Sequence, residues 1–185
     1  MTTPIRKNGA LVRDLAQALG QMTPNQLDRA LREHPFTRGL SDNHLAKLAA
    51  CGQIVSLAED EVVFRAHQPS SHFYLLLTGS VCVEVRTPVH AICVQSVHPG
   101  EAFGWSSLLP SHQTMFQVRA HEESAAICLD GQQLSAACEQ DPSLGYEVLR
   151  RLLDVVFRRL QATERRLAEF WGVRAATDQI RRPCE

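Results

Sequence analysis

Short apolar segments separated by turn-forming residues follow one another from residue 54 to residue 130, and this pattern constrains the fold most strongly. The segments are rich in Val, Ile, Leu and Phe, whereas the breaks between them contain Gly, Pro, Asp or Ser. They span residues 54–57, 62–64, 73–78, 80–86, 91–97, 102–104, 115–120 and 124–130. Short strands at such spacing are typical of antiparallel sandwiches and barrels. We therefore expect a mainly β fold of about eight strands.

One predicted hairpin, formed by residues 80–86 and 91–97, alternates clearly between apolar and other side chains. Successive side chains of a strand point to opposite faces of a sheet. The predicted core face holds Val81, Val83, Val85, Ile92 and Val94, and the predicted outer face holds Cys82, Glu84, Arg86 and Cys93. If the strands pair around Thr87 and Pro88, Cys82 and Cys93 lie directly opposite each other.

Helices are predicted on both sides of the strands. Before them, an apolar stripe at residues 11–19 and a second one after Thr23-Pro24 indicate two amphipathic helices, and Ser41 is the expected N-cap of a third. After them, residues 131–140 form a short helix, and Asp141-Pro142 begins a long helix that reaches Trp171. The predicted organisation is a helical extension (1–33), a β domain (34–140), a long helix (141–171) and a tail (172–185).

The long helix carries its apolar residues at alternating spacings of four and three. The repeat runs through Leu149, Leu153, Val156, Leu160, Thr163, Leu167 and Phe170. Such a heptad repeat is typical of a coiled-coil seam, in which Thr163, the polar member, could set the register. The alternative is a helix that packs only on its own domain. A homodimer is favoured, because one-sided packing needs no sustained repeat of this kind.

Composition limits the class of protein. The net charge is −1 at pH 7, so no overall field attracts nucleic acid. No apolar run reaches the roughly 18 residues of a transmembrane helix. The first residues, MTTPIRKNG, lack the apolar region of a secretory signal. A cytoplasmic location without membrane contact is therefore expected.

The six cysteines show neither C-x-x-C nor zinc-binding spacing, so reduced thiols are expected. The alternative is a functional disulfide between Cys82 and Cys93. No nucleophile–base arrangement, metal motif or pair of carboxylates stands out. The chain is therefore not expected to be an enzyme, and no metal site is predicted.

Four stretches carry a resemblance to a known family. They are HPFTRGLSDNHLAKLA at 34–49, FYLLLTGSVCVEV at 73–85, PGEAFGW at 99–105 and VRA at 118–120. Together, over residues 34–171, the chain resembles the cyclic nucleotide-binding domain of the catabolite-activator family. The resemblance implies an eight-stranded antiparallel jelly roll with flanking helices, a long C-terminal dimerisation helix, and a phosphate-binding cassette after Gly104. Asp60 and His67 stand where the family usually has glycines in tight turns.

Two charged ligands of that cassette are missing here. The family has a Glu directly after the glycine, where this chain has Trp105, and an Arg ten or eleven residues on, at Thr114 or Met115. A phosphate in a partly buried site needs a charge-assisted partner, so cAMP and cGMP should bind weakly. The remaining donors are amides and hydroxyls at the start of a short helix. The candidate ligand-binding residues are Gly104, Trp105, Ser106, Ser107 and Thr114.

A narrower resemblance rests on FGWSSLLP at 103–110, DPSLGYEVLRRLLDVV at 141–156 and RLQATERRLAEFWG at 159–172. These stretches are similar to freestanding domains that accompany bacterial hydrogenases and related NAD(P)-linked redox enzymes. They imply a non-catalytic accessory subunit docked on such an enzyme. Only 14 residues follow Trp171, too few for the helix-turn-helix of the family's transcription factors, so DNA binding is not expected. The alternative is a homodimeric sensor of a nucleotide ligand, either NADPH or a cyclic nucleotide.

Overall fold

The computed structural model of the chain describes residues 24–87, 90–109, 114 and 116–170. The predicted stripe at residues 11–19 and the predicted tail lie outside them. The chain divides into two compact units, Met1–Val148 and Leu149–Glu185. The first turns of the last helix are grouped with the β unit, and the predicted domain boundaries stay a prediction.

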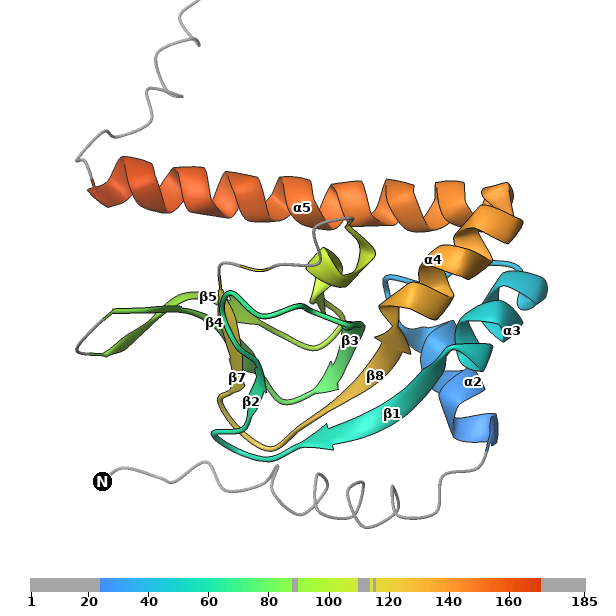
Figure 1. Cartoon of the computed structure of the whole chain (residues 1–185), viewed down its shortest axis with the longest axis horizontal. Coiled ribbons are helices and arrows are strands. Elements are labelled where there is room, and N and C mark those ends of the chain that lie inside the picture. The colour runs from blue at the N-terminus through green and yellow to red at the C-terminus, as the bar shows by residue number, and fades with distance from the viewer. Residues whose placement is uncertain (1–23, 88–89, 110–113, 115, 171–185) are drawn as a thin grey trace, which may run out of the picture. The chain divides into compact units, whose positions relative to one another are not determined.

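Two four-stranded antiparallel sheets form the first unit (Figure 1). The first has the order β1-β8-β3-β6, formed by Gly52–Leu57, Ser124–Asp130, His72–Thr78 and Ala102–Phe103. The second has the order β2-β7-β4-β5, formed by Val62–Phe64, Gln117–Ala120, Val81–Arg86 and Ala91–Val97. This is the predicted jelly roll. All of the predicted strands are present, with ends shifted by at most two residues.

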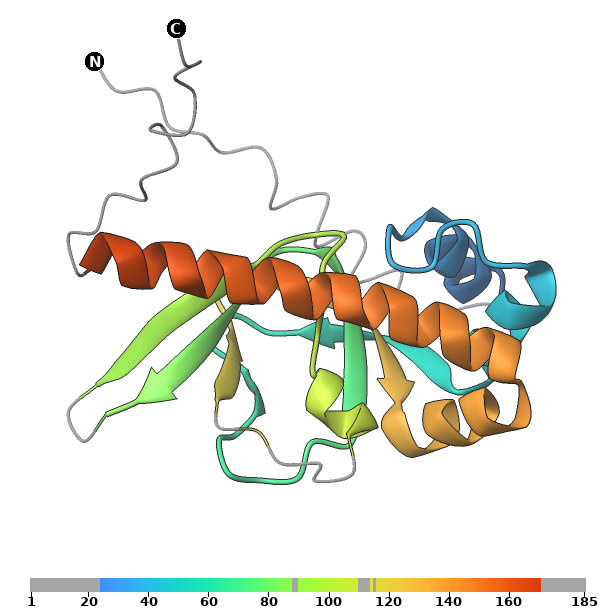
Figure 2. The same cartoon turned by 90° about the horizontal axis from the view of Figure 1, so that it is seen from above.

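The strands β3 and β8 of the first sheet are buried on both faces, which explains their unbroken apolar sequences. Tyr74 and Leu76 of β3 face the second sheet and belong to the core. The other face is covered by α2 (Pro24–Glu33), α3 (Asp42–Ala50) and α4 (Gly131–Gln140), which contact β1, β3 or β8. There Phe73 packs edge-on against Phe36, with ring centroids 5.2 Å apart. The three helices gather at one end of the roll (Figure 2).

The second sheet is apolar on its inner face. Val81 and Val83 of β4 and Val118 of β7 belong to the core, which confirms the predicted inward face of the two β4 valines. The side chains between them alternate to the outer face. There Arg119 forms an ion pair with Glu84, with Nε and Oε1 3.2 Å apart. β4 and β7 therefore mix apolar and polar residues where β3 does not.

A bulge changes the pairing that the sequence predicts for β4 and β5. The register shifts between Val83 and Glu84, so that Cys82 pairs with Ser96 and Glu84 with Cys93. The predicted direct pairing of the two cysteines is therefore wrong. A disulfide nevertheless joins Cys82 to Cys93 diagonally across the strands, contrary to the expectation of reduced thiols for this pair.

The outer half of this hairpin projects away from the helical end of the roll (Figures 1 and 2). Ile92 pairs with Val85 and is 45% exposed, whereas Val94 packs against the core. Ile92 therefore lies on the same face as Val85, as predicted, but the strands continue beyond the apolar cluster and leave it exposed.

The last helix, α5 (Pro142–Phe170), begins at Asp141 as predicted. Oδ1 of Asp141 accepts hydrogen bonds from the amides of Ser143 and Leu144, and its Oδ2 lies 2.7 Å from Nζ of Lys47 on α3. The hydrogen bond from Lys47 holds the pKa of Asp141 below its ordinary value. Leu144 and Val148 are buried, which anchors the start of α5 in the first unit.

The predicted seam lies along α5. Leu149, Leu153, Leu160 and Leu167 are each more than half exposed. The hydroxyl of Thr163 donates to the carbonyl oxygen of Arg159 one turn earlier, at 2.9 Å. The side chain of Phe170 lies outside the described residues. Dimerisation through this seam stays a prediction.

Candidate ligand site

Gly104 opens the segment that corresponds to the phosphate cassette. Its φ of 80° lies in the left-handed region, directly after β6. A β-carbon here would lie 2.7 Å from the carbonyl oxygen of His72 and 3.2 Å from Cδ2 of Tyr74. The dihedral angle and the close approach of backbone both require glycine. The short 3-10 helix η2 (Trp105–Leu108) follows, and the Trp105 side chain at its start is half-buried.

The serines of η2 are buried, and Ser107 directs its donors into the turn. The amide and the hydroxyl of Ser107 both donate to the carbonyl oxygen of Gly104, at 3.1 and 2.8 Å. In this conformation neither donor of Ser107 is directed toward a ligand. Ser106 and Trp105 are therefore the candidates that remain at this end of the cassette, beside Gly104.

Thr114 is one of the two positions, with Met115, at which the resemblance predicts the family's phosphate-binding arginine. Its hydroxyl lies 3.2 Å from both the amide nitrogen and the carbonyl oxygen of Phe116. Its carbonyl oxygen accepts a hydrogen bond of 2.7 Å from the amide of His67. His67 and Asp60 adopt left-handed φ values of 62° and 64°, so both turns form without glycine. Thr114 thus stabilises the turn between β2 and β3. Met115, the alternative arginine position, lies outside the described residues.

Aromatic rings fill the roll beside Gly104. Tyr74 and Phe103 stack with centroids 4.8 Å apart and planes 4° apart, and Phe64 lies 6.4 Å from each ring. Burial raises the pKa of Tyr74 above its ordinary value, so the phenol stays neutral. The interior next to the cassette is therefore apolar and closely packed.

No aspartate, glutamate, lysine or arginine occurs between Glu101 and Arg119. Arg119 itself points to the outer face of the second sheet, where its Nη1 donates to the carbonyl oxygen of Asp60 at 2.8 Å. It also contacts Glu84 there. The segment after Gly104 therefore combines a left-handed glycine turn and a short helix with no charged side chain between Glu101 and Arg119.

The architecture described above is similar to that of known proteins. Residues 54–141 match the family model of the cyclic nucleotide-binding domain. This part of the chain is therefore similar to the cyclic nucleotide-binding domain. The domain occupies the two sheets and α4. No curated protein matches the chain.

Solved structures share the fold of the domain. A protein from Geobacter metallireducens GS-15, described as a cyclic nucleotide-binding protein, is 25% identical with a TM-score of 0.63, and the match covers 76% of this chain and 99% of that one. A cyclic nucleotide-binding domain from Methylobacillus flagellatus KT is 20% identical with a TM-score of 0.66, covering 79% and 83%. A mutant regulatory subunit of a cAMP-independent protein kinase A from Trypanosoma brucei, bound to cAMP in its A site, is 20% identical with a TM-score of 0.60, covering 85% and 57%.

Membrane spans and metal clusters are two further features that bear on function. No helix in the described ranges is both long and apolar enough to cross a membrane. Among the described residues, no three or more His, Cys, Asp or Glu side chains are grouped to hold a metal ion.

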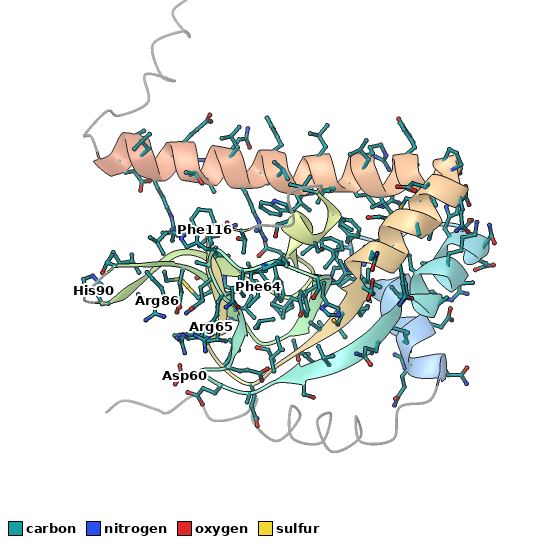
Figure 3. All side chains as sticks on the ribbon, viewed as in Figure 1. Asp60, Phe64, Arg65, Arg86, His90 and Phe116 are labelled. Atoms are coloured by element: carbon teal, nitrogen blue, oxygen red, sulfur yellow. A yellow bond between two sulfur atoms is a disulfide. The ribbon has the colours of Figure 1, made fainter. Side chains whose placement is uncertain are left out.

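Three arginines that sequence reasoning missed lie around one pocket on the outer face of the second sheet: Arg65, Arg86 and Arg119. Figure 3 labels Arg65 and Arg86 near the β4–β5 hairpin. The sequence contained part of the information needed to find this pocket, because the alternation of β4 and β7 places Arg86 and Arg119 on one face. The contribution of Arg65, which follows β2, depends on the strand order.

Proposed function

We propose that this chain is a non-catalytic regulatory or accessory subunit whose cyclic nucleotide-binding domain does not respond to cAMP or cGMP. The uncharged cassette carries the proposal, since the resemblance puts Trp105 at the glutamate position and Thr114 or Met115 at the arginine position. A cyclic phosphate in a partly buried roll needs a charge-assisted partner, and neither side chain supplies one. The domain then acts through contacts with proteins instead of a cyclic nucleotide signal.

The proposed partner is a bacterial NAD(P)-linked redox enzyme such as a soluble hydrogenase. The similarity of residues 103–110, 141–156 and 159–172 to accessory domains of such enzymes supports this choice. In the proposed assembly, the exposed leucines of α5 form a homodimer seam, because burying apolar surface stabilises association. The apolar stripe at residues 11–19 is the proposed contact with the enzyme.

The second candidate function is a freestanding sensor of a nucleotide ligand. The glycine turn favours it, since Gly104 keeps the left-handed conformation and the close contact with His72 that hold η2 in place. NADPH or a cyclic nucleotide would then contact Trp105 and the amide of Ser106.

Calorimetric titration of the purified chain with cAMP, cGMP, ATP and NADPH separates the two functions. Absence of binding by all four at the cassette supports the accessory subunit and rules out the sensor. Micromolar binding of any of them that Ser106→Asp abolishes supports the sensor, because the added carboxylate repels an anion at η2.

A gain of binding tests the missing charges directly. The double variant Trp105→Glu, Thr114→Arg restores a carboxylate for the ribose hydroxyl and a guanidinium for the phosphate. We expect its affinity for cAMP to exceed that of the natural chain by about tenfold or more. Trp105→Gln, Thr114→Gln is the matched control, with the same positions changed and no charge added. Equal and tight cAMP binding by the natural chain and both variants contradicts the proposal.

The protein kinase A subunit from Trypanosoma brucei supports this design. It is described as cAMP-independent, and its cAMP-bound form carries three substitutions, one of which replaces threonine by arginine. The same replacement at Thr114 is the central change of the double variant.

Co-purification tests the partner. The tagged chain is recovered from cells that produce a soluble NAD(P)-linked hydrogenase, and the hydrogenase subunits are expected in the same fraction. A homogeneous homodimer free of larger proteins counts against the accessory role, whatever the titrations show.

A further inference from the structure

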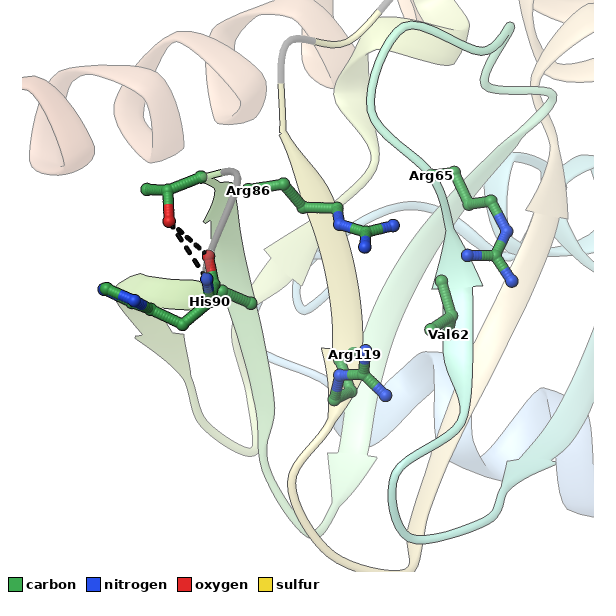
Figure 4. Close-up of a pocket in the computed structure, with 7 residues that line it drawn as sticks. Val62, Arg65, Arg86, His90 and Arg119 are labelled. Atoms are coloured by element: carbon green, nitrogen blue, oxygen red, sulfur yellow. Dashed lines mark hydrogen bonds between the residues drawn. The ribbon is translucent and has the colours of Figure 1, made fainter.

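A pocket of about 490 Å³ opens on the outer face of the second sheet (Figure 4). Val62 of β2, Arg86 of β4 and Arg119 of β7 line it, together with Arg65, Thr87 and His90 from the turns. The pocket is separate from the cassette, because Val118, next to Arg119, faces the core on the opposite side of the sheet. Its volume is within the range of small-molecule sites.

Three guanidinium groups are directed toward this space, those of Arg86 on β4, Arg119 on β7 and Arg65 in the turn after β2 (Figure 4). Arg119 is fixed, since it contacts Glu84 and the carbonyl oxygen of Asp60. The guanidinium groups of Arg65 and Arg86 form no hydrogen bond or ion pair with another described residue. Two positive charges therefore face the pocket without a counter-charge from the described chain.

The nearest buried carboxylate does not neutralise them. Glu84 is 8% exposed, and its Oε2 accepts a hydrogen bond of 2.7 Å from Nε2 of Gln117. Its Oε1 accepts one from Arg119 at 3.2 Å. Among the described residues no carboxylate lines the pocket itself. The local field there is positive and favours an anion.

We propose that this pocket binds a phosphorylated small molecule, with its phosphoryl group held between Arg65 and Arg86. A guanidinium offers its donors in a planar fork that matches two phosphate oxygens. The positions are set by the strands. Arg86 ends β4, and the turn that follows is closed by the Thr87 hydroxyl, which donates to the carbonyl oxygen of His90 at 2.8 Å. Val62 offers an apolar wall beside the charges for the rest of a nucleotide-sized ligand.

NMR titration with AMP tests the proposal, with adenosine as the uncharged counterpart. We expect AMP to shift the Nε–H signals of Arg65 and Arg86, and adenosine to leave them in place. Arg65→Gln, Arg86→Gln should weaken AMP binding by about tenfold or more, because charge-assisted hydrogen bonds are lost. Arg165→Gln, Arg166→Gln on α5 removes the same charge and should change the affinity by less than about twofold.

The conservative variant Arg65→Lys, Arg86→Lys keeps the charge and removes the planar forks. It should bind AMP at least about threefold more weakly than the natural chain. This variant also serves if the glutamine variant does not fold. The proposal is overturned if millimolar AMP leaves the two Nε–H signals unchanged, or if the α5 control loses as much affinity as the glutamine variant. If the lysine variant binds AMP as tightly as the natural chain, the planar guanidinium groups are not required for binding.

This inference does not rest on the proposed function. If AMP shifts the amides of η2 and not the signals of Arg65 and Arg86, the outer-face site is wrong and the nucleotide sensor gains support. If AMP shifts only the two arginines, the cassette proposal stands unchanged. The glutamine variant then removes the outer-face contribution from the titration with cAMP.

Discussion

The carbonyl oxygen of His72 occupies the place that a side chain at Gly104 would need. A β-carbon at Gly104 would lie 2.7 Å from that oxygen. His72 belongs to β3 and pairs with Asp130 of β8, so its backbone cannot move without disturbing that pairing. The turn that holds the cassette is therefore fixed by the main chain of the first sheet. It forms with Trp105 directly after the glycine and with no charged side chain between Glu101 and Arg119.

Gly104→Ala is expected to destabilise the fold by about 2–4 kcal/mol, through both the left-handed φ and the contact with backbone. Gly39→Ala is the matched control, because Gly39 has the same φ of 80° and nothing within 4 Å of the place that its β-carbon would take. That control should lose only about 1 kcal/mol. Urea unfolding of both variants measures the difference. Equal losses would show that the contact with His72 contributes nothing.

The burial of His34 predicts that the folded chain loses stability in mild acid. It is 3% exposed, its Nδ1 accepts from the amide of Phe36 at 3.1 Å, and its Nε2 lies 3.2 Å from the carbonyl oxygen of Leu76. Burial lowers its pKa to about 4. Below the unfolded pKa of about 6.5, the unfolded chain therefore takes up a proton that the folded chain does not.

The stability should fall as the pH drops from about 6.5 to about 4, by up to about 3 kcal/mol from this residue. Urea unfolding at a series of pH values measures the slope. His34→Gln can still donate to Leu76 but does not titrate, so its curve should be flatter over this interval. Parallel curves for the two proteins would assign the pH dependence to other groups.

Leu153→Glu with Leu160→Glu is expected to convert a dimer into a monomer. Both leucines are more than half exposed on α5 and belong to the seam. Charges facing each other across a coiled coil weaken it strongly. Analytical ultracentrifugation measures the mass. Arg165→Gln with Arg158→Gln changes the net charge by the same amount at positions outside the seam and should leave the dimer intact. A natural chain that is already monomeric would contradict dimerisation through the seam.

Reduction of the Cys82–Cys93 disulfide should lower the stability by up to about 3 kcal/mol, because a closed loop of this length restricts the unfolded chain. Urea unfolding with and without dithiothreitol measures the change. Cys82→Ser with Cys93→Ser should be equally stable in both conditions. A natural chain that does not respond to dithiothreitol argues against a bridge in solution.

Local signals explain what the sequence could predict. Ser41 accepts from the amide of His44, and Asp141 caps α5, as the short polar side chains at these positions indicated. The strands followed from apolar runs and turn residues. The neutral cassette was equally visible, because it depends only on the residue types at Trp105 and Thr114.

Long-range geometry explains what the sequence missed. The bulge between Val83 and Glu84 inserts one residue into the pairing, and no residue type at this place predicts a bulge. The direction of the Ser107 donors depends on the backbone of η2. The pocket around Arg65 needs three strands that are far apart along the chain.

The unequal burial of the two sheets has a consequence for how such domains diversify. Substitutions in β3 or β8 meet packed neighbours on either side, so few are tolerated. Among the outward positions of β4 and β7, Arg86 is exposed and Arg119 is partly exposed, whereas Cys82, Glu84 and Gln117 are buried. A domain of this architecture can therefore carry a recognition surface around Arg86 and Arg119 on the exterior of the second sheet while the packing of β3 and β8 stays constant.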